Sequence, residues 1–536
     1  MSSIVKRIST PEYLFCILVF TNLLNYSDRG IIPGSSSQFN EFIMDSIDTT
    51  TPDVFLGLLQ SSFIIGFSLS SLIFANLIHH YPPFLIAACG LSIWLCAVTM
   101  SGLAYYTKSY YFLMLARCIS GVGEASFQVA VPPWIAIYSP SGKTATWMSI
   151  FYTAIPVGTA IGYTYSAAIS STIGWQFAFF FEVLLLAPAV VYLFVIYKEY
   201  PLGSIGSSRS SKAEPSSDTS GAKPTICEEL VIVSKCPVYV LLLLGYAAQT
   251  FVLIGISTFG SSFLLNLGYF ASESECSMVF GAIICVSGLI GTPLGGVVLD
   301  RISTHKENNC RRNHTDSSSD SEYNRLNLND DTDDELYNPS PSDGRRVVKQ
   351  SKLFAFIRDS DFEVLLADTQ MITIASFLGT IFLLSIYFTS NKYVFIVLIS
   401  LGSTLIFFCN SGINLAIILA VPSNHRSFAV AVACLTIHGL GDVPSPVITG
   451  YIKDRLAPDC TTTTNEACAG EKEGLRLTML IITVWLFWTI FFFALAAYKC
   501  FNDLKLRRKS ILDELLLTVD DSSSADDTLQ PQGHKV

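Results

Sequence analysis

The stretch ARCISGVGEASF (Ala116–Phe127) places an arginine and a glutamate inside a run of small and apolar residues. Arg117 and Glu124 are seven residues apart. In an α-helix this is nearly two turns, so both side chains lie on one face, about 10 Å apart along the axis. A second pair, Asp28-Arg29 in NYSDRG, follows another apolar run. Buried acids beside bases can switch protonation, because burial and a nearby cation shift a carboxyl group in opposite directions.

These charges stand in a chain that is unusually apolar for its length. Of its 536 residues, 51% are hydrophobic and only 14% are charged. Apolar runs of about 20 residues, the length that crosses a membrane, start near Tyr13, Leu56, Phe84, Tyr110, Ala145, Phe177, Tyr239, Met278, Leu365, Tyr393, Phe428 and Leu477. Because only helices satisfy their own backbone in lipid at such lengths, we predict an all-α integral membrane protein of about twelve transmembrane helices.

The polar segments divide the predicted helices into two sets of six. Two repeated halves separated by a long polar linker are typical of secondary transporters, whose substrate site lies between the halves. A linker rich in Ser, Gly and Lys cannot form a packed core. The predicted organisation is an N-terminal tail at 1–11, an N-terminal half at 12–199, a disordered linker at 200–236, a C-terminal half at 237–500 with a disordered acidic insertion at 303–349, and a C-terminal tail at 501–536.

Loop charges set the predicted orientation. Lys and Arg gather in both tails and in the linker, whereas the first loop (Ser35–Val54) has neither. By the positive-inside rule both termini, the linker and the insertion are cytosolic. The exceptions are Lys108, Lys392, Lys453 and Arg455. Cys460 and Cys468 lie in a loop on the opposite face, where a disulfide is chemically permitted, the alternative being two unpaired thiols.

Ionisable residues inside a membrane usually face a cavity or each other. We favour a functional role, in which Asp28 or Glu124 takes up and releases a proton while Arg29 or Arg117 pairs with the ionised carboxylate. The same cations could instead hold a phosphate or carboxylate head group. In the structural alternative, Arg117 extends to the nearer surface, Asp28 neutralises a cation on the fourth helix, and Glu124 only accepts hydrogen bonds. A further acid, Asp442, stands near the middle of the eleventh predicted helix.

Five stretches together resemble the major facilitator superfamily, and specifically the Spinster family of lipid transporters. They are NYSDRG (Asn25–Gly30), GLLQSSF (Gly57–Phe63), ARCISGVGEASF (Ala116–Phe127), SIFYTAIPVGTAIGY (Ser149–Tyr163) and LGDVPSPVITGYIKDRL (Leu440–Leu456). The resemblance implies alternating access through a cavity between two six-helix halves. It implies a lysophospholipid or sphingolipid substrate and, in the lysosomal branch, coupling to protons.

The resemblance also assigns residues. Asp28 and Arg29 match the family's pair in the first helix, Arg117 and Glu124 match the fourth, and Asp442 lies in the kinked eleventh. The lipid head group is expected near Arg29, Arg117 and Glu124, in an apolar and aromatic cavity. The predicted lining residues are Asn25, Tyr26, Gln128, Phe151, Tyr152, Tyr163, His438 and Asp442.

The sequence departs from the family at the end of the second helix. The family has Gly-x-x-x-Asp-Arg there, whereas this chain has His79 and His80 where the Asp-Arg pair would stand. The second half keeps Asp300 and Arg301. We interpret these four residues as a cytosolic gate. Either the change is drift in a gate supported elsewhere, or the two histidines make the outward-open state sensitive to pH, since histidine titrates near pH 6.5.

The expected partners are a lipid substrate, protons and the membrane. No cofactor, metal, nucleic-acid partner or enzymatic activity is expected, and the chain is expected to act as a monomer. Tyr323–Leu326 has the form of a signal for a cytosolic sorting adaptor. The membrane would be lysosomal, late endosomal or the plasma membrane. Two alternatives stay open: a proton-coupled transporter of a sugar or organic anion, and a membrane sensor or scaffold that transports nothing.

Overall fold

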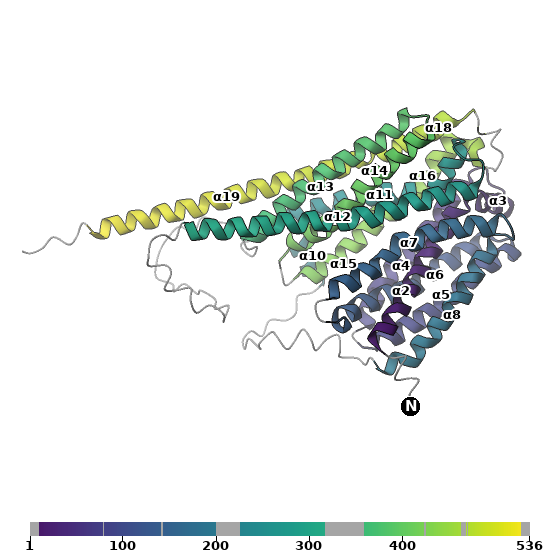
Figure 1. Ribbon diagram of the computed structural model, residues 1–536, viewed down its shortest axis with the longest axis horizontal. Helices are drawn as coiled ribbons and strands as arrows, with labels where there is room; N and C mark the ends of the chain where they lie inside the picture. Colours follow the sequence, from purple (N-terminus) through teal and green to yellow (C-terminus); the bar gives the residue numbers. More distant parts are fainter. Residues whose placement is uncertain are drawn as a thin grey trace, which may run out of the picture.

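The computed structural model describes residues 10–78, 80–140, 143–199, 226–316, 359–422, 425–461, 468 and 470–526. Within these ranges the regular structure is helical and contains no strand, which confirms the predicted all-α class. His79 and the Tyr323–Leu326 motif lie outside the described residues. Figure 1 shows the helices grouped in two bundles, one from each half of the sequence.

The N-terminal bundle contains six long helices and one short one. They are α2 (Pro11–Gly34), α3 (Ser36–Ile47, the short one), α4 (Pro52–Leu77), α5 (Pro83–Thr107), α6 (Tyr110–Tyr138), α7 (Thr144–Ser170) and α8 (Gln176–Ile196), followed by a 3-10 turn at Tyr197–Glu199. A proline stands at the first position of α2, α4 and α5. Proline is favoured there because its missing N–H is not needed and its φ angle already suits the helix.

The C-terminal bundle repeats this plan with more interruptions. Its elements are α10 (Ile226–Ser234), α11 (Pro237–Asn266), α12 (Glu273–Asp316), α13 (Asp359–Ser385), α14 (Lys392–Leu419), α15 (Arg426–Ile437), a π-helix η5 (His438–Asp442), α16 (Pro444–Leu456), α18 (Lys472–Val484) and α19 (Leu486–Asp526), with 3-10 turns at Ile386–Phe388 and Pro458–Thr461. Counting α15–η5–α16 and α18–α19 as one each, every predicted apolar run corresponds to a helix. Helix α10 lies inside the predicted linker, and α12 and α19 continue past residues 303 and 500.

Nine helices of the described part are long and apolar enough to cross a membrane by themselves. The other three predicted spans, α2, α6 and α7, are 24, 29 and 27 residues long but more polar. Two of these carry the charges that the sequence singled out, Asp28 and Arg29 on α2 and Arg117 and Glu124 on α6. Polar helices of this kind are stable within a bundle when their polar faces are covered by protein.

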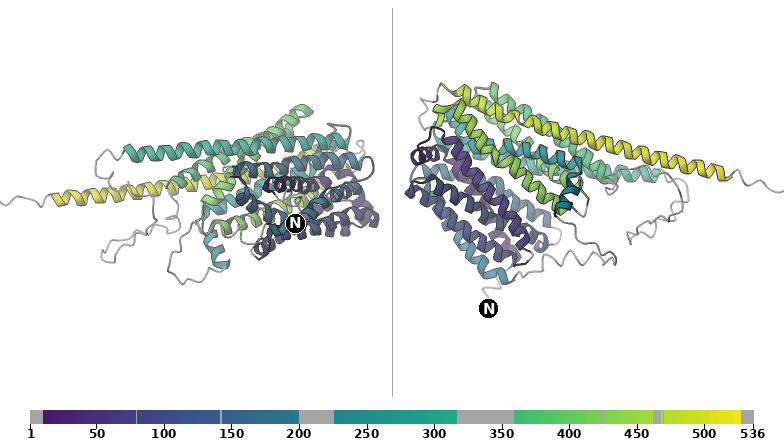
Figure 2. Two further views of the ribbon diagram at one scale, coloured as in Figure 1. Left: turned by 60° about the horizontal axis from the view of Figure 1, so that its bottom comes forward. Right: turned by 180° about the vertical axis from the view of Figure 1, so that it is seen from behind.

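The two bundles meet at one end and diverge toward the other, as Figures 1 and 2 show. We call the end that holds α3 and the start of α18 the α3 end. A single hydrophobic core runs through the N-terminal bundle and continues into the C-terminal bundle at the α3 end, where it includes Phe259 and Phe280. A second core, around Tyr239 and Phe493, lies within the C-terminal bundle alone. The halves therefore share their packing at the α3 end.

Candidate functional site

The first buried ion pair joins Asp28 of α2 to Arg117 of α6. Nη1 of Arg117 donates to both carboxylate oxygens of Asp28, at 2.8 Å each, and neither side chain has any exposed surface. Arg117 therefore does not extend to the membrane surface, contrary to the structural alternative. Ionised partners make hydrogen bonds about twice as strong as neutral ones, so this pair ties the two helices together.

The second pair runs between the same helices. Nη2 of Arg29 donates to Oε1 of Glu124 at 2.6 Å. Glu124 is fully buried, but 27% of the Arg29 side chain is exposed. Asp28 and Arg29 thus point to different partners, as neighbours on a helix must. We call Asp28, Arg29, Arg117 and Glu124 the ion cluster.

Aromatic rings cover the exposed side of the ion cluster. The guanidinium carbon of Arg29 lies 4.7 Å from the ring centre of Tyr26, 4.9 Å from that of Phe63 and 5.1 Å from that of Phe67. The Phe63 ring also lies 4.9 Å from the guanidinium carbon of Arg117. Cations within about 6 Å of a ring centre are attracted to its face. Helix α4 comes this close because Gly121 of α6 has no side chain to keep Phe63 O away.

Several residues predicted to line the cavity are buried in this conformation and cannot line it. Phe151 is fully buried and its carbonyl accepts a hydrogen bond from Asn22. Asn25 is fully buried as well, and its two side-chain polar atoms have no partner. Tyr163 is buried where α7 meets the C-terminal half, and its hydroxyl donates to Ser257 O. The remaining residues on the N-terminal side of the predicted lining are accessible to different extents: Tyr26 and Gln128 partly, and Tyr152 to 47%.

The C-terminal half contributes a histidine–carboxylate pair at the π-helix. His438 Nδ1 lies 2.6 Å from Oδ2 of Asp442, and both side chains are partly exposed. The His438 ring meets the ring of Phe67 edge to face, 5.9 Å between centres. Since Phe67 also covers Arg29, one aromatic side chain contacts the charged groups of both halves. A π-helix, which is rare and often marks a functional site, holds this pair.

The predicted gate residues that the structure describes lie at the end of the molecule opposite the α3 end. His80, Asp300 and Arg301 are all exposed. The N–H of His80 donates to Leu77 O at the end of α4.

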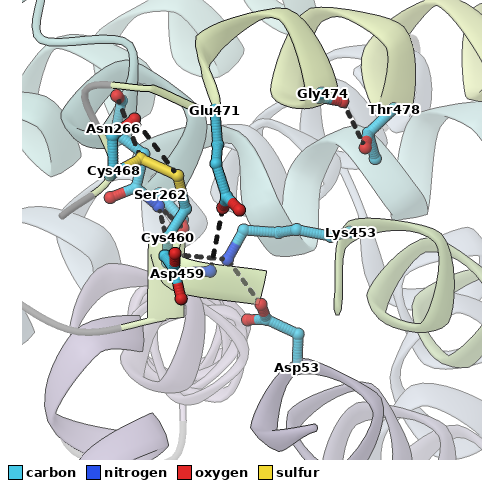
Figure 3. Close-up of a disulfide and its surroundings, with 10 residues drawn as sticks. All are labelled: Asp53, Ser262, Asn266, Lys453, Asp459, Cys460, Cys468, Glu471, Gly474 and Thr478. Atoms are coloured by element: carbon cyan, nitrogen blue, oxygen red, sulfur yellow. Dashed lines mark hydrogen bonds and ion pairs between the residues drawn. A yellow bond between two sulfur atoms is a disulfide. The ribbon is translucent and has the colours of Figure 1, made fainter. Parts of the chain in front are cut away.

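The α3 end holds an inter-half lock that the sequence did not reveal. Lys453 of α16 is fully buried, and its Nζ lies 2.6 Å from Oδ2 of Asp53 of α4 (Figure 3). The next residue, Asp454, accepts hydrogen bonds from the backbone N–H groups of Asp53 and Val54, at 3.3 and 2.9 Å. Gly450 permits this approach, because a Cβ there would lie 2.2 Å from Asp53 O.

A disulfide braces the lock from the C-terminal side. Cys460 and Cys468 are bridged and buried. The carbonyl of Cys460 accepts hydrogen bonds from Asn266 Nδ2 at 2.8 Å and Lys453 Nζ at 3.5 Å (Figure 3). The bridged loop therefore holds an acceptor beside the lysine that joins the halves.

Two buried charged residues were not predicted from the sequence, for different reasons. Lys453 was counted as a loop charge against the orientation rule, although it is a buried helical residue paired across the halves. Glu182 was passed over inside FFFEVLLL, yet it is the one charged residue within the bounds of α8 and is 1% exposed. A charge inside an apolar run was the available signal for Glu182, whereas Lys453 stands near the end of a span beside Asp454 and Arg455.

This fold and this site define a class: a two-bundle helical membrane protein whose halves meet around buried charges. Residues 18–309, more than half of the chain, match the family profile described as Major Facilitator Superfamily. The chain belongs to this superfamily. Residues 389–474 also match a profile described as Organic Anion Transporter Polypeptide (OATP) family.

The resemblance to Spinster proteins is confirmed by curated relatives. The Arabidopsis thaliana protein named "Probable sphingolipid transporter spinster homolog 2" is 27% identical over 463 residues, which cover 83% of this chain and 81% of the relative. The Homo sapiens "Protein spinster homolog 1" is 30% identical over 305 residues, 54% of each chain.

Solved structures share the fold. A bacterial homolog of the human lysosomal transporter Spinster, in an inward-facing and occupied conformation, aligns with a TM-score of 0.64 over 92% of this chain and 98% of its own, at 17% identity. A mutant of the nucleoside transporter NupG aligns with a TM-score of 0.57 over 90% of this chain and 99% of its own, at 10% identity. At such identities the likeness concerns the fold.

Proposed function

We propose that this protein moves a lysophospholipid or sphingolipid across a membrane by alternating access, coupled to protons. The observation that carries the proposal is the partly exposed Arg29, which is paired with buried Glu124 and surrounded by aromatic rings. A guanidinium with a free edge can bind an anionic head group. The rings of Phe63 and Phe67 would then contact the start of the acyl chain.

The relatives support the choice of a lipid. Those in Arabidopsis are named as probable sphingolipid transporters, and they align with more than four fifths of this chain. The outward-facing apolar side chains of several helices would let an acyl chain leave sideways into the bilayer while the head group stays at Arg29.

We further propose that both termini are cytosolic and that the α3 end faces the exterior or a lumen. The loop charges support this orientation, and so does the disulfide, because bridges persist in oxidising compartments. In this orientation the structure is the state closed to the outside. The membrane would be that of a lysosome, a late endosome or the cell surface.

Uptake into proteoliposomes tests the proposal. The full chain would be reconstituted and offered fluorescent lysophosphatidylcholine or sphingosine phosphate, with and without a pH gradient. We expect saturable uptake, stimulated by the gradient and abolished in Arg29→Gln. Arg455→Gln is the matched control, since Arg455 is an exposed cation far from the ion cluster. Equal uptake by wild type and empty vesicles would reject transport of these lipids.

The match at residues 389–474 favours one second candidate, an organic anion transporter. The same assay with a labelled aryl sulfate distinguishes the two. Lipid transport predicts that lysophosphatidylcholine competes with the anion or that the anion is not carried. If the aryl sulfate is transported and excess lysolipid does not reduce its uptake, the second candidate is established. Transport by wild type that is lost in folded Glu124→Gln would argue against the sensor or scaffold.

A further inference from the structure

The N-terminal half contains a buried carboxylate outside both the ion cluster and the lock, Glu182 of α8. It is 1% exposed, and neither of its oxygens has a partner at hydrogen-bonding geometry. The ion cluster supplies two cations and two carboxylates, which are already paired with each other. Glu182 therefore stands beside the cluster without a cation of its own.

Glu182 is close to the Asp28–Arg117 pair. Its carboxyl group lies within electrostatic range of Asp28 and Arg117 and near the hydroxyls of Ser27 and Tyr165. The Tyr165 hydroxyl donates to Ala178 O, one turn before Glu182 on α8. The remaining helix packed against α8, α5, contains no charged or histidine residue within its bounds. Asp28, Arg117 and Tyr165 are thus the ionisable groups that Glu182 faces.

The Asp28–Arg117 pair is itself incompletely satisfied. Only Nη1 of Arg117 donates to Asp28, while Nε and Nη2 are buried without an acceptor. Unmade hydrogen bonds of a buried charged group are unfavourable. A network in which free donors of Arg117 and free acceptors of Glu182 stand close together has a second arrangement available to it.

We propose that Glu182 holds a proton in this conformation and serves as the alternative partner of Arg117. In the exchange, the proton leaves the carboxyl group of Glu182 and binds the carboxylate of Asp28. Arg117 then releases Asp28, now neutral, and directs its free Nε and Nη2 donors to the ionised Glu182. Charge and protons balance, since the ion cluster and Glu182 together have two cations and two ionised carboxylates before and after the step. One of the two ion pairs between α2 and α6 is thereby broken.

The proposal deepens the proton coupling of the proposed function, and its first test does not depend on transport. Infrared spectroscopy of the full chain in phosphatidylcholine nanodiscs detects protonated carboxyl groups by their carbonyl band. At about pH 7, where an ordinary glutamic acid is ionised, we expect a band that Glu182→Gln removes. Asp368→Asn is the matched control, because Asp368 is a fully buried carboxylate without a partner in the other half.

The decisive variant is Asp28→Asn. It leaves Arg117 without its carboxylate, so we expect Glu182 to ionise and its band to disappear, while the band of Asp368 stays. Persistence of the Glu182 band in folded Asp28→Asn would overturn the proposal, as would its absence from wild type. If Asp28→Asn does not fold, Arg117→Gln gives the opposite expectation, a Glu182 band that persists to higher pH than in wild type.

A second measurement concerns coupling. Glu182→Gln cannot release a proton, so exchange of fluorescent lysophosphatidylcholine without a gradient should continue while its stimulation by a pH gradient is lost. Retained stimulation in Glu182→Gln would overturn the role of Glu182 in coupling. If wild type carries no lipid, the proposed function fails and the infrared result still decides the protonation of Glu182.

Discussion

The two halves repeat one arrangement of helices but join their first and fourth long helices differently. In the N-terminal half, two ion pairs connect α2 to α6. In the C-terminal half, Gln249 of α11 meets α14 through neutral groups, with Nε2 3.3 Å from both Asn410 Oδ1 and Ile406 O. A neutral pair cannot change with protonation, whereas the ion pairs can.

The position of the charges adds to this difference. His438–Asp442 and Lys499–Asp503 in the C-terminal half each join residues four positions apart on one stretch of helix. Such pairs move with their helix, whereas a pair between two helices is made or broken when the helices shift. We therefore expect changes of charge to affect the N-terminal half more than the C-terminal half.

The largest effect is expected from Arg117→Leu. It leaves Asp28 buried without a cation, which typically costs 3–5 kcal/mol, so roughly that loss of stability is expected. Gln249→Leu at the corresponding place of the other half should cost only about 1 kcal/mol. Thermal unfolding of the purified variants measures both. Equal costs would remove the distinction between the halves.

A double variant separates stability from function. Replacing both partners, as Asp28→Leu with Arg117→Met, leaves no unpaired charge and should recover most of the stability. Lipid uptake should stay at the level of empty vesicles, because the exchangeable pair is gone. Recovery of uptake together with stability would assign the pair a structural role alone.

Next in size is the effect of Glu124→Gln. The amide oxygen can still accept from Arg29, so the fold should be kept, but the charge that holds Arg29 is lost. A hydrogen bond to a charged group contributes about 1.5–3 kcal/mol, and we expect gradient-driven uptake to fall about tenfold or more. Uptake by Asp442→Asn, a variant of the other half, should fall less. A larger loss in Asp442→Asn would transfer the coupling site to the C-terminal half.

A smaller effect is expected at the lock. Lys453→Met leaves Asp53 without its cation, and because Asp53 can be hydrated once the α3 end opens, the population open there should rise roughly tenfold or more. Probes at the exposed positions Asp45 of α3 and Glu473 of α18 report this as a population with a longer distance. Arg455→Met, an exposed cation on the same helix, should leave the distances unchanged. An unchanged distribution in Lys453→Met would show that apolar packing alone closes this end.

The smallest effect is expected from removal of the disulfide. Cys460→Ser with Cys468→Ser frees the carbonyl that lies 3.5 Å from Lys453 Nζ. A hydrogen bond of this kind contributes about 0.5–1 kcal/mol, so the open population should rise only about two- to fivefold. The same probes measure it, and a reducing agent should change wild type but not the double variant. A larger shift than in Lys453→Met would make the loop, rather than the ion pair, the main closure.

The sequence alone predicted the helical class because the length of an apolar run is a direct consequence of membrane thickness. It also marked Asp28, Arg29, Arg117 and Glu124, since charges in apolar runs are conspicuous. It offered Asp28 as the partner of a cation on the fourth helix only as one of two alternatives, and the structure pairs Asp28 with Arg117. Which carboxylate meets Arg117 depends on the register between α2 and α6, and no local pattern encodes that register.

The residues that were missed teach the same lesson. Glu182 belongs to a run that is apolar apart from it, so an average over the run concealed it. Lys453 stands near the end of a span, where sequence does not distinguish a loop charge from a buried helical one. Its role depends on Asp53, 400 residues away. Contacts between halves follow from the packing of the whole fold and are not visible in either half by itself.

Asp454 of the lock also caps the start of helix α4. Helix α4 has no capping side chain of its own at Thr51, and the first N–H groups of a helix need outside acceptors. The carboxylate of Asp454, in the other bundle, supplies these acceptors. The positive end of the α4 dipole stabilises its negative charge. Opening the α3 end therefore uncaps a helix. The uncapped N–H groups can bind water only where water reaches them, so separation of the halves begins at the outer rim and proceeds inward.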